Sequence, residues 1–163
     1  MSKQFLSSII LCLFTCTPAL AANTATPSAP WGGASLTPTD YKPQKVVYDV
    51  HLKTIDALSS VLDRASHISK ITGANPFEQS IVLVLHGAEI KFFARKNYAE
   101  YKELMHRAQS LVLGEVLKIK MCEIAARSKG FQAEDIHGFV EMVPMGDAEI
   151  VRLQNDEGHA YMR

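Results

Sequence analysis

The run Ile81-Val82-Leu83-Val84-Leu85-His86-Gly87 decides the fold. Its first five residues are all branched and apolar, without a polar residue at alternate positions. Such a run is typical of a strand that is covered on both faces in a parallel sheet. The polar His86 and the flexible Gly87 end it. We therefore expect residues 81–85 to form a central strand with helices on both sides.

Segments with strand and helix periodicity alternate on either side of this run. Upstream, residues 45–51 are β-branched and aromatic and predict a strand. A helix is predicted over residues 55–68, where apolar residues recur at helical spacing, and Gly73 follows as a stop. The downstream predictions are a helix at 98–111 capped by Gly114, a strand at 117–121, a short helix at 122–129 ended by Gly130, a strand at 139–143, a helix from Asp147 as N-cap to 155, and a short strand at 159–162.

This alternation predicts an α/β fold: a three-layer α/β/α arrangement with right-handed crossovers and a mainly parallel sheet of four to five strands. Lys118 and Lys120 alternate with apolar residues, which indicates a half-exposed strand whose lysines discourage edge-to-edge pairing. Ligands of such sheets bind beyond the carboxyl ends of the strands. In this chain those ends carry His51, His86, Cys122 and the turn at residues 144–147.

The N-terminus has the layout of a secretory signal peptide. Lys3 supplies a positive charge, residues 5–16 form an uncharged, largely apolar run, and Ala19-Leu20-Ala21 is a small-residue cleavage pattern. The alternative is an uncleaved membrane anchor, which the short apolar run disfavours. We therefore expect a signal peptide at residues 1–21 and an exported, periplasmic protein without a membrane partner after cleavage.

The remaining chain predicts a short linker and one domain. Residues 22–43 hold four prolines among small and polar residues, which is typical of a flexible or polyproline-like lead-in. Residues 44–163 are the expected domain. Loss of Lys3 leaves 16 basic residues (17 − 1) against 17 acidic ones. Because nucleic-acid binding needs a clustered positive surplus, we do not expect nucleic acid as a partner.

The cysteines focus the functional question on one residue. Cys12 and Cys16 lie in the expected signal peptide, so the mature chain keeps Cys122 alone and has no intramolecular disulfide. Three states of this thiol stay open from the sequence. It is buried and inert, paired with another chain, or reactive.

Cys122 stands where the third expected strand passes into a helix. Backbone N–H groups and the helix dipole at such a position favour the nucleophilic thiolate. His86 ends the central strand, from where its imidazole can serve Cys122 as a base or hydrogen-bond partner if the strands are neighbours. The structural alternative is a packed cysteine beside a satisfied histidine. Glu89, three residues after His86, either orients that ring or faces solvent.

Motifs for metals and nucleotides are absent from the sequence. Its six histidines are scattered, without HExxH or paired CxxC spacing, and Asp135 with His137 is too small a set for a site. Neither GxGxxG nor GxxxxGK[ST] occurs. We therefore expect no metal and no cofactor.

Three segments resemble the DsrE/DsrF-like family of sulfur-relay proteins. They are the apolar strand ending in His86-Gly87, the strand-to-helix turn at Met121-Cys122 followed by Lys129-Gly130-Phe131, and the closing stretch from Phe139 through Val143-Pro144 and Leu153-Gln154 to Tyr161. The resemblance spans residues 45–162. It implies a small α/β fold that forms trimers or hexamers, and in some members the cysteine matching Cys122 carries sulfur as a persulfide.

Two functions follow as hypotheses. In the first, the chain is a periplasmic sulfur carrier or thiol-handling protein in which Cys122 accepts sulfur, His86 tunes it, and another protein donates or receives the sulfur. In the second, it is a non-catalytic oligomeric binding module with a buried structural Cys122. Relay members of the family act in the cytoplasm, so the expected export sets this chain apart from them.

Overall fold

The computed structural model of the chain describes residues 29–163. The expected signal peptide at residues 1–21 and the first part of the expected lead-in lie outside the described residues. Residues 29–44 contain no helix or strand. Contacts group Thr39–Arg163 into one compact unit, separate from the residues up to Pro38. No helix in residues 29–163 has the length and apolar character needed to cross a membrane.

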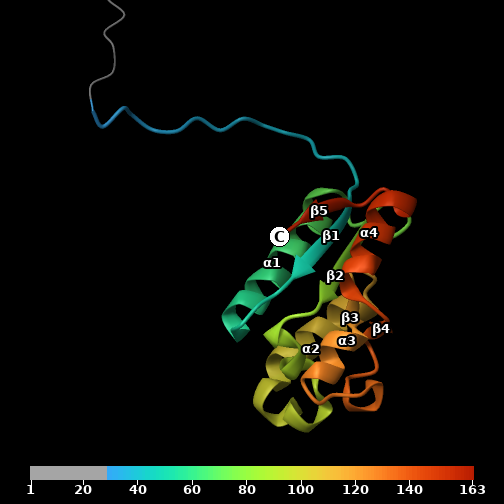
Figure 1. The fold of residues 1–163 in the computed structure, drawn as a ribbon. Helices are drawn as coiled ribbons and strands as arrows, with labels where there is room; N and C mark the ends of the chain where they lie inside the picture. Colours follow the sequence, from blue (N-terminus) through green and yellow to red (C-terminus); the bar gives the residue numbers. More distant parts are fainter. Residues whose placement is uncertain (1–28) are drawn as a thin grey trace, which may run out of the picture. The chain divides into compact units, whose positions relative to one another are not determined.

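Within the described residues, five parallel strands form one sheet (Figure 1). The neighbours along the sheet are ordered β4-β3-β2-β1-β5, and every neighbouring pair is parallel. The central position of β2 agrees with its uninterrupted apolar run. The strands are β1 (Lys45–Val50), β2 (Ser80–Leu85), β3 (Lys118–Cys122), β4 (Glu141–Val143) and β5 (Ala160–Met162).

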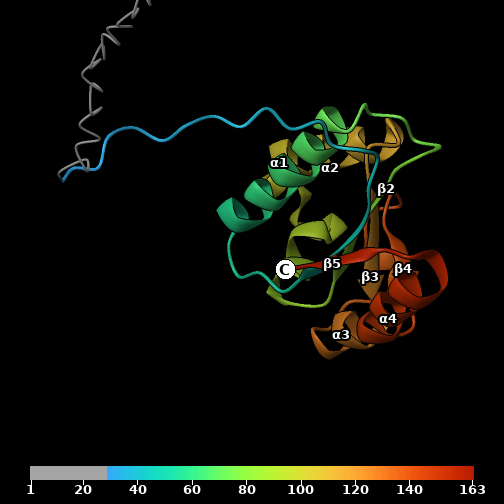
Figure 2. The same cartoon turned by 90° about the horizontal axis from the view of Figure 1, so that it is seen from above.

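Helices cover both faces of this sheet (Figure 2). Strands β1 to β4 step in one direction, so right-handed crossovers place α1 and α2 on one face, and the return to β5 beside β1 places α4 on the other. The predicted α/β fold is thereby confirmed. The helices are α1 (Ile55–Ile71), η1 (Ala88–Phe93), η2 (Arg95–Asn97), α2 (Tyr98–Leu113), α3 (Glu123–Ser128), η3 (Ala133–Asp135) and α4 (Gly146–Glu157), where η marks a 3-10 helix.

The central strand β2 separates two apolar clusters. Leu83 and Leu85 point into the larger one, which they share with α1 and α2. Val82 and Val84 point into a smaller one, which they share with Ile150 and Leu153 of α4. Because successive strand residues face opposite sides, both faces of β2 must be apolar, and this is the reason its sequence lacks alternation.

Three local predictions are wrong. Strand β3 is not exposed at an edge: it pairs with β2 and β4, and Lys120 is buried because α4 covers this face. Helix α4 begins at Gly146 with Met145 as its N-cap, so Asp147 is an exposed residue of the first turn and not the cap. Strand β4 is also shorter than predicted, because the N–H of Val140 bonds the carbonyl of His137 in a turn.

A buried histidine joins the end of α4 to the start of β2. The Nδ1 of His159 lies 3.1 Å from the carbonyl oxygen of Leu153, and its Nε2 lies 2.9 Å from the hydroxyl of Ser80. Burial lowers the pKa of His159 below its usual value. The neutral ring is therefore the form that the folded protein accommodates, with Nδ1 donating and Nε2 accepting.

This burial predicts a loss of stability in mild acid. As the pH falls below about 6.5, the unfolded chain takes up a proton at residue 159 before the folded protein does, so the free energy of unfolding decreases. Urea titrations between about pH 7 and pH 5 should show a shallower decrease for His159→Asn, although that variant is less stable at neutral pH. Part of the decrease should persist, because burial also lowers the pKa of His137. Parallel curves for the two proteins would contradict this assignment.

Candidate functional site

Three strands bring the sequence-predicted site residues to one edge of the sheet. Val50 pairs with Leu85, and Leu85 pairs with Met121, so the next residue on each strand lies at the same level. Neighbouring strands are about 4.8 Å apart. His86 therefore has Cys122 beside it on the β3 side. On the β1 side lies His51, whose ring meets that of His86 edge to face with centroids 5.5 Å apart.

A pocket of about 210 Å³ opens at this edge. It is lined mainly by short or apolar side chains from the end of β3, from α3 and from the turn before α4. This volume is room for a few heavy atoms, and it is too small for a nucleotide. The lining residues are His86, Cys122, Ile124, Ala125, Ser128, Met145 and Asp147.

Cys122 is the N-cap of α3 and one of the residues that line the pocket. The Sγ accepts a hydrogen bond from the N–H of Ala125 at 3.4 Å, a contact that favours negative charge on sulfur. Only 6% of the residue is exposed. Cys122 is therefore largely covered by protein and borders the pocket.

Gly146 makes this close packing possible. A Cβ placed on Gly146 would lie 3.2 Å from the Cβ of Cys122 and 3.4 Å from the Cβ of His86. Such distances are tighter than ordinary van der Waals contact. The first residue of α4 is thus seated directly over the two candidate side chains, and a larger residue would have to push them apart.

His86 is held by a carboxylate from β1. Its Nε2 lies 2.5 Å from Oδ1 of Asp49, and the hydroxyl of Tyr161 on β5 donates to Oδ2 of the same carboxylate at 2.5 Å. Burial alone would raise the pKa of Asp49, but the hydrogen bonds from Tyr161 and His86 outweigh it and hold that pKa below its usual value. The bond to Asp49 in turn raises the pKa of Tyr161. Asp49 is therefore an anion at neutral pH.

Glu89 neither orients His86 nor faces solvent, so both sequence interpretations of this residue are wrong. It is completely buried, and its two oxygens accept the N–H groups of Gly87 and Leu52, each at 2.7 Å. Its carboxylate joins the loop after β1 to the loop after β2. It positions the backbone beside His86 and takes no part in the pocket.

Sequence reasoning missed Asp49 and Tyr161. A signal for Asp49 was present, since it is an acid inside the otherwise apolar strand β1 and faces the side opposite to Tyr48 and Val50. Tyr161 gave no such signal. It meets Asp49 across 112 positions of the chain, in a strand of three residues.

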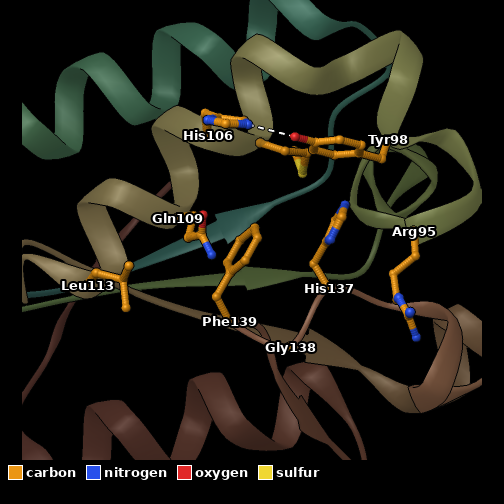
Figure 3. A pocket seen from close by; sticks show the side chains of 9 residues that line it. Arg95, Tyr98, His106, Gln109, Leu113, His137, Gly138 and Phe139 are labelled. Carbon is orange, nitrogen blue, oxygen red and sulfur yellow. Dashed lines mark hydrogen bonds between the residues drawn. The ribbon is translucent and has the colours of Figure 1, made fainter.

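A second cavity lies along α2, away from Cys122 and His86 (Figure 3). Its volume is about 600 Å³. The hydroxyl of Tyr98 lies 2.6 Å from Nε2 of His106, and the ring of His137 faces Tyr98 with centroids 5.7 Å apart. Figure 3 shows His137 and Phe139 pointing from the loop before β4 towards this helix. The cavity has aromatic walls, and its lining residues include no Cys, Ser or Thr.

The described part of the chain contains no group of three or more His, Cys, Asp or Glu side chains arranged to hold a metal ion. At the edge of the sheet, His86 bonds Asp49, and the sulfur of Cys122 accepts from the backbone N–H of Ala125. The chemistry available there is that of a thiol beside an imidazole and a carboxylate. These groups suit nucleophilic attack and proton transfer.

Comparison with known proteins adds information on the fold. The chain matches no family model and no curated protein. Among solved structures it is similar to that of MTH1491 from Methanobacterium thermoautotrophicum, a protein of unknown function, with 25% identity and a TM-score of 0.54. The similarity covers 74% of this chain and 98% of the other. The chain thus shares its α/β fold with a protein that is itself without an assigned activity.

Proposed function

We propose that the chain is a periplasmic DsrE/DsrF-like sulfur carrier in which Cys122 accepts a sulfane sulfur atom and holds it as a persulfide. One observation carries the proposal: Cys122 is one of the residues that line an open pocket beside His86 at the carboxyl edge of the sheet. A cysteine that only fills the core would have no such access. By the same family resemblance, we propose a trimer or hexamer and a separate protein as sulfur donor or acceptor.

The proposed reaction is a transfer of sulfur between thiols. The Cys122 thiolate attacks the outer sulfur of a donor persulfide, R–S–SH, and a new S–S bond forms at Cys122. The S–S bond of the donor breaks, and R–S⁻ leaves with the electron pair. Cys122 then carries –S–SH, and no external oxidant or reductant is consumed. His86 can take the proton of the Cys122 thiol before the attack.

Two local features support a thiolate at this position. The N–H of Ala125 points at the sulfur. Glu123, whose charge would oppose the thiolate, forms an ion pair with Arg127 one turn further along α3. This ion pair partly offsets the charge that opposes the thiolate.

Intact-mass spectrometry tests the proposal. After incubation with glutathione persulfide, we expect the protein to gain about 32 Da, the mass of one sulfur atom, and peptide mapping should place the gain on Cys122. A reducing thiol should remove it. Cys122→Ser should show no gain, whereas Ser128→Ala, which alters another residue of the pocket wall, should retain it. An unmodified Cys122 in the wild-type protein would reject the proposal.

The low exposure of Cys122 favours a second candidate, a non-catalytic binding module in which the thiol is only packed. Labelling of the native protein with iodoacetamide separates the two candidates. Rapid alkylation of Cys122 before unfolding supports the carrier. Protection until denaturant unfolds the chain supports the binding module, because an enclosed thiol reacts only when the surrounding structure opens.

A further inference from the structure

The chain of hydrogen bonds from Tyr161 through Asp49 to His86 joins three strands at the candidate site. Asp49 and His86 are both largely covered, with 18% and 20% of their side chains exposed. Both oxygens of Asp49 are occupied, one by His86 and one by Tyr161, each at 2.5 Å. The arrangement uses β5, β1 and the end of β2, so it forms only in the folded sheet.

A carboxylate only accepts hydrogen bonds, and this decides where the proton of His86 lies. The Nε2 that faces Asp49 must carry hydrogen. In the neutral ring, Nδ1 is then the nitrogen with a free lone pair. His86 and Cys122 line the same pocket.

We propose that Asp49 and Tyr161 are positioning residues that hold His86 as the Nε2–H tautomer, with Nδ1 left to receive the proton of the Cys122 thiol. The role at Cys122 rests on the proposed sulfur-carrier function. The tautomer does not, since it follows from the contact of His86 with Asp49. Tyr161 acts one step further away, by fixing the second oxygen of the carboxylate.

A positioning role of Asp49 and a general effect of its negative charge predict opposite results when Asp49 is replaced. A positioning role predicts that loss of Asp49 makes the thiolate harder to form, because the imidazole loses its orientation and the partner of its cationic form. A general effect predicts the opposite, because removal of any nearby negative charge favours a thiolate. His51 contacts His86, Tyr161 bonds Asp49, and Asp147 lines the pocket with His86 and Cys122. Arg163 acts on Asp49 from the chain end, and Glu123, next to Cys122 in the chain, is paired with Arg127.

The experiment compares Asp49→Asn with Asp147→Asn. Both remove one carboxylate near the pocket, but only Asp49 bonds His86. We expect Asp49→Asn to lower the rate of Cys122 alkylation at neutral pH by about tenfold. The rise of this rate with pH should also shift to higher pH, because the group that orients the base is lost. Asp147→Asn should raise the rate, because it removes a negative charge near the thiol and leaves the partner of His86 in place. Tyr161→Phe should lower it by about two- to threefold, whereas Tyr98→Phe, which removes a hydroxyl from a histidine at the second cavity, should have no effect.

Nitrogen-15 NMR of His86 gives the second readout. We expect the Nε2–H tautomer in the wild-type protein and a mixture of tautomers in Asp49→Asn. A wild-type Nδ1–H tautomer, or a pH profile that responds equally to both asparagine variants, would overturn the inference. If the tautomer and the alkylation profile are as expected but no sulfur is taken up, the proposed function fails and the positioning role stands. If Cys122 is not alkylated in the native wild-type protein, both fail.

Discussion

Replacement of Glu89 by alanine is expected to lower the free energy of unfolding by about 3–5 kcal/mol, because two buried N–H groups lose their acceptor at about 1–3 kcal/mol each, and a cavity is added. The carboxylate is completely buried and accepts from Leu52 and Gly87. Urea denaturation followed by circular dichroism measures the effect.

Two variants make this prediction specific. Glu89→Gln keeps one acceptor oxygen but turns an amide N–H₂ towards one of the two backbone donors, so we expect about half of the loss. Glu103→Ala removes the same side chain from the exposed side of α2 and should change stability by less than about 0.5 kcal/mol. A Glu89→Ala protein as stable as Glu103→Ala would show that the loops do not depend on this carboxylate.

Lys120→Met is expected to cost about 2–3 kcal/mol, although methionine preserves most of the aliphatic volume of lysine. The ammonium of Lys120 lies 2.9 Å from a carboxylate oxygen of both Glu141 and Glu149. The side chain of Glu149 is only 11% exposed, so it becomes a poorly solvated charge when Lys120 is lost. Its remaining partner is Arg152, and this limits the cost.

A matched control lies two residues away on the same face of β3. Lys118 is exposed, and Lys118→Met should change stability by less than about 0.5 kcal/mol.

The dependence of stability on pH provides a further check. Hydrogen bonds from Arg152 and Lys120 lower the pKa of Glu149 from 4.5 to about 2. The stability that Glu149 contributes is therefore present above about pH 5 and is lost as the pH falls towards 2, so the wild type and Lys120→Met should converge in acid. Equal losses for the two lysine variants would contradict the buried ion pair.

These two lysines illustrate how far local pattern can be read. In the sequence both alternate with apolar residues in the same way, and both were predicted to be exposed. Their difference arises from α4, which crosses over one end of this face and brings Glu149 to Lys120. Residue periodicity reports that a position faces away from one core. It does not report which helix, from far along the chain, covers the other side.

In the candidate site, too, some residues could be placed from the sequence and others only from the structure. The positions of His86 and Cys122 at strand ends follow from the sequence, because each apolar run stops at them and parallel strands end at a common edge. Asp49 looked like an isolated polar residue in a strand. Its role depends on two neighbouring strands. The end of β2 brings Nε2 of His86 to 2.5 Å from Oδ1 of Asp49, and β5 pairs with β1 and brings the hydroxyl of Tyr161 to Oδ2.

The sequence by itself determined the order of the strands and α-helices and the α/β fold, since these depend on local periodicity and on the apolar run of β2. Only the tertiary structure decided which strand lies at an edge, which lysine is buried, what Glu89 binds, and which residues hold His86. Those features are contacts between residues that are distant in the chain. Their energies come from burial and hydrogen bonds that exist once the sheet has assembled, so no local pattern encodes them.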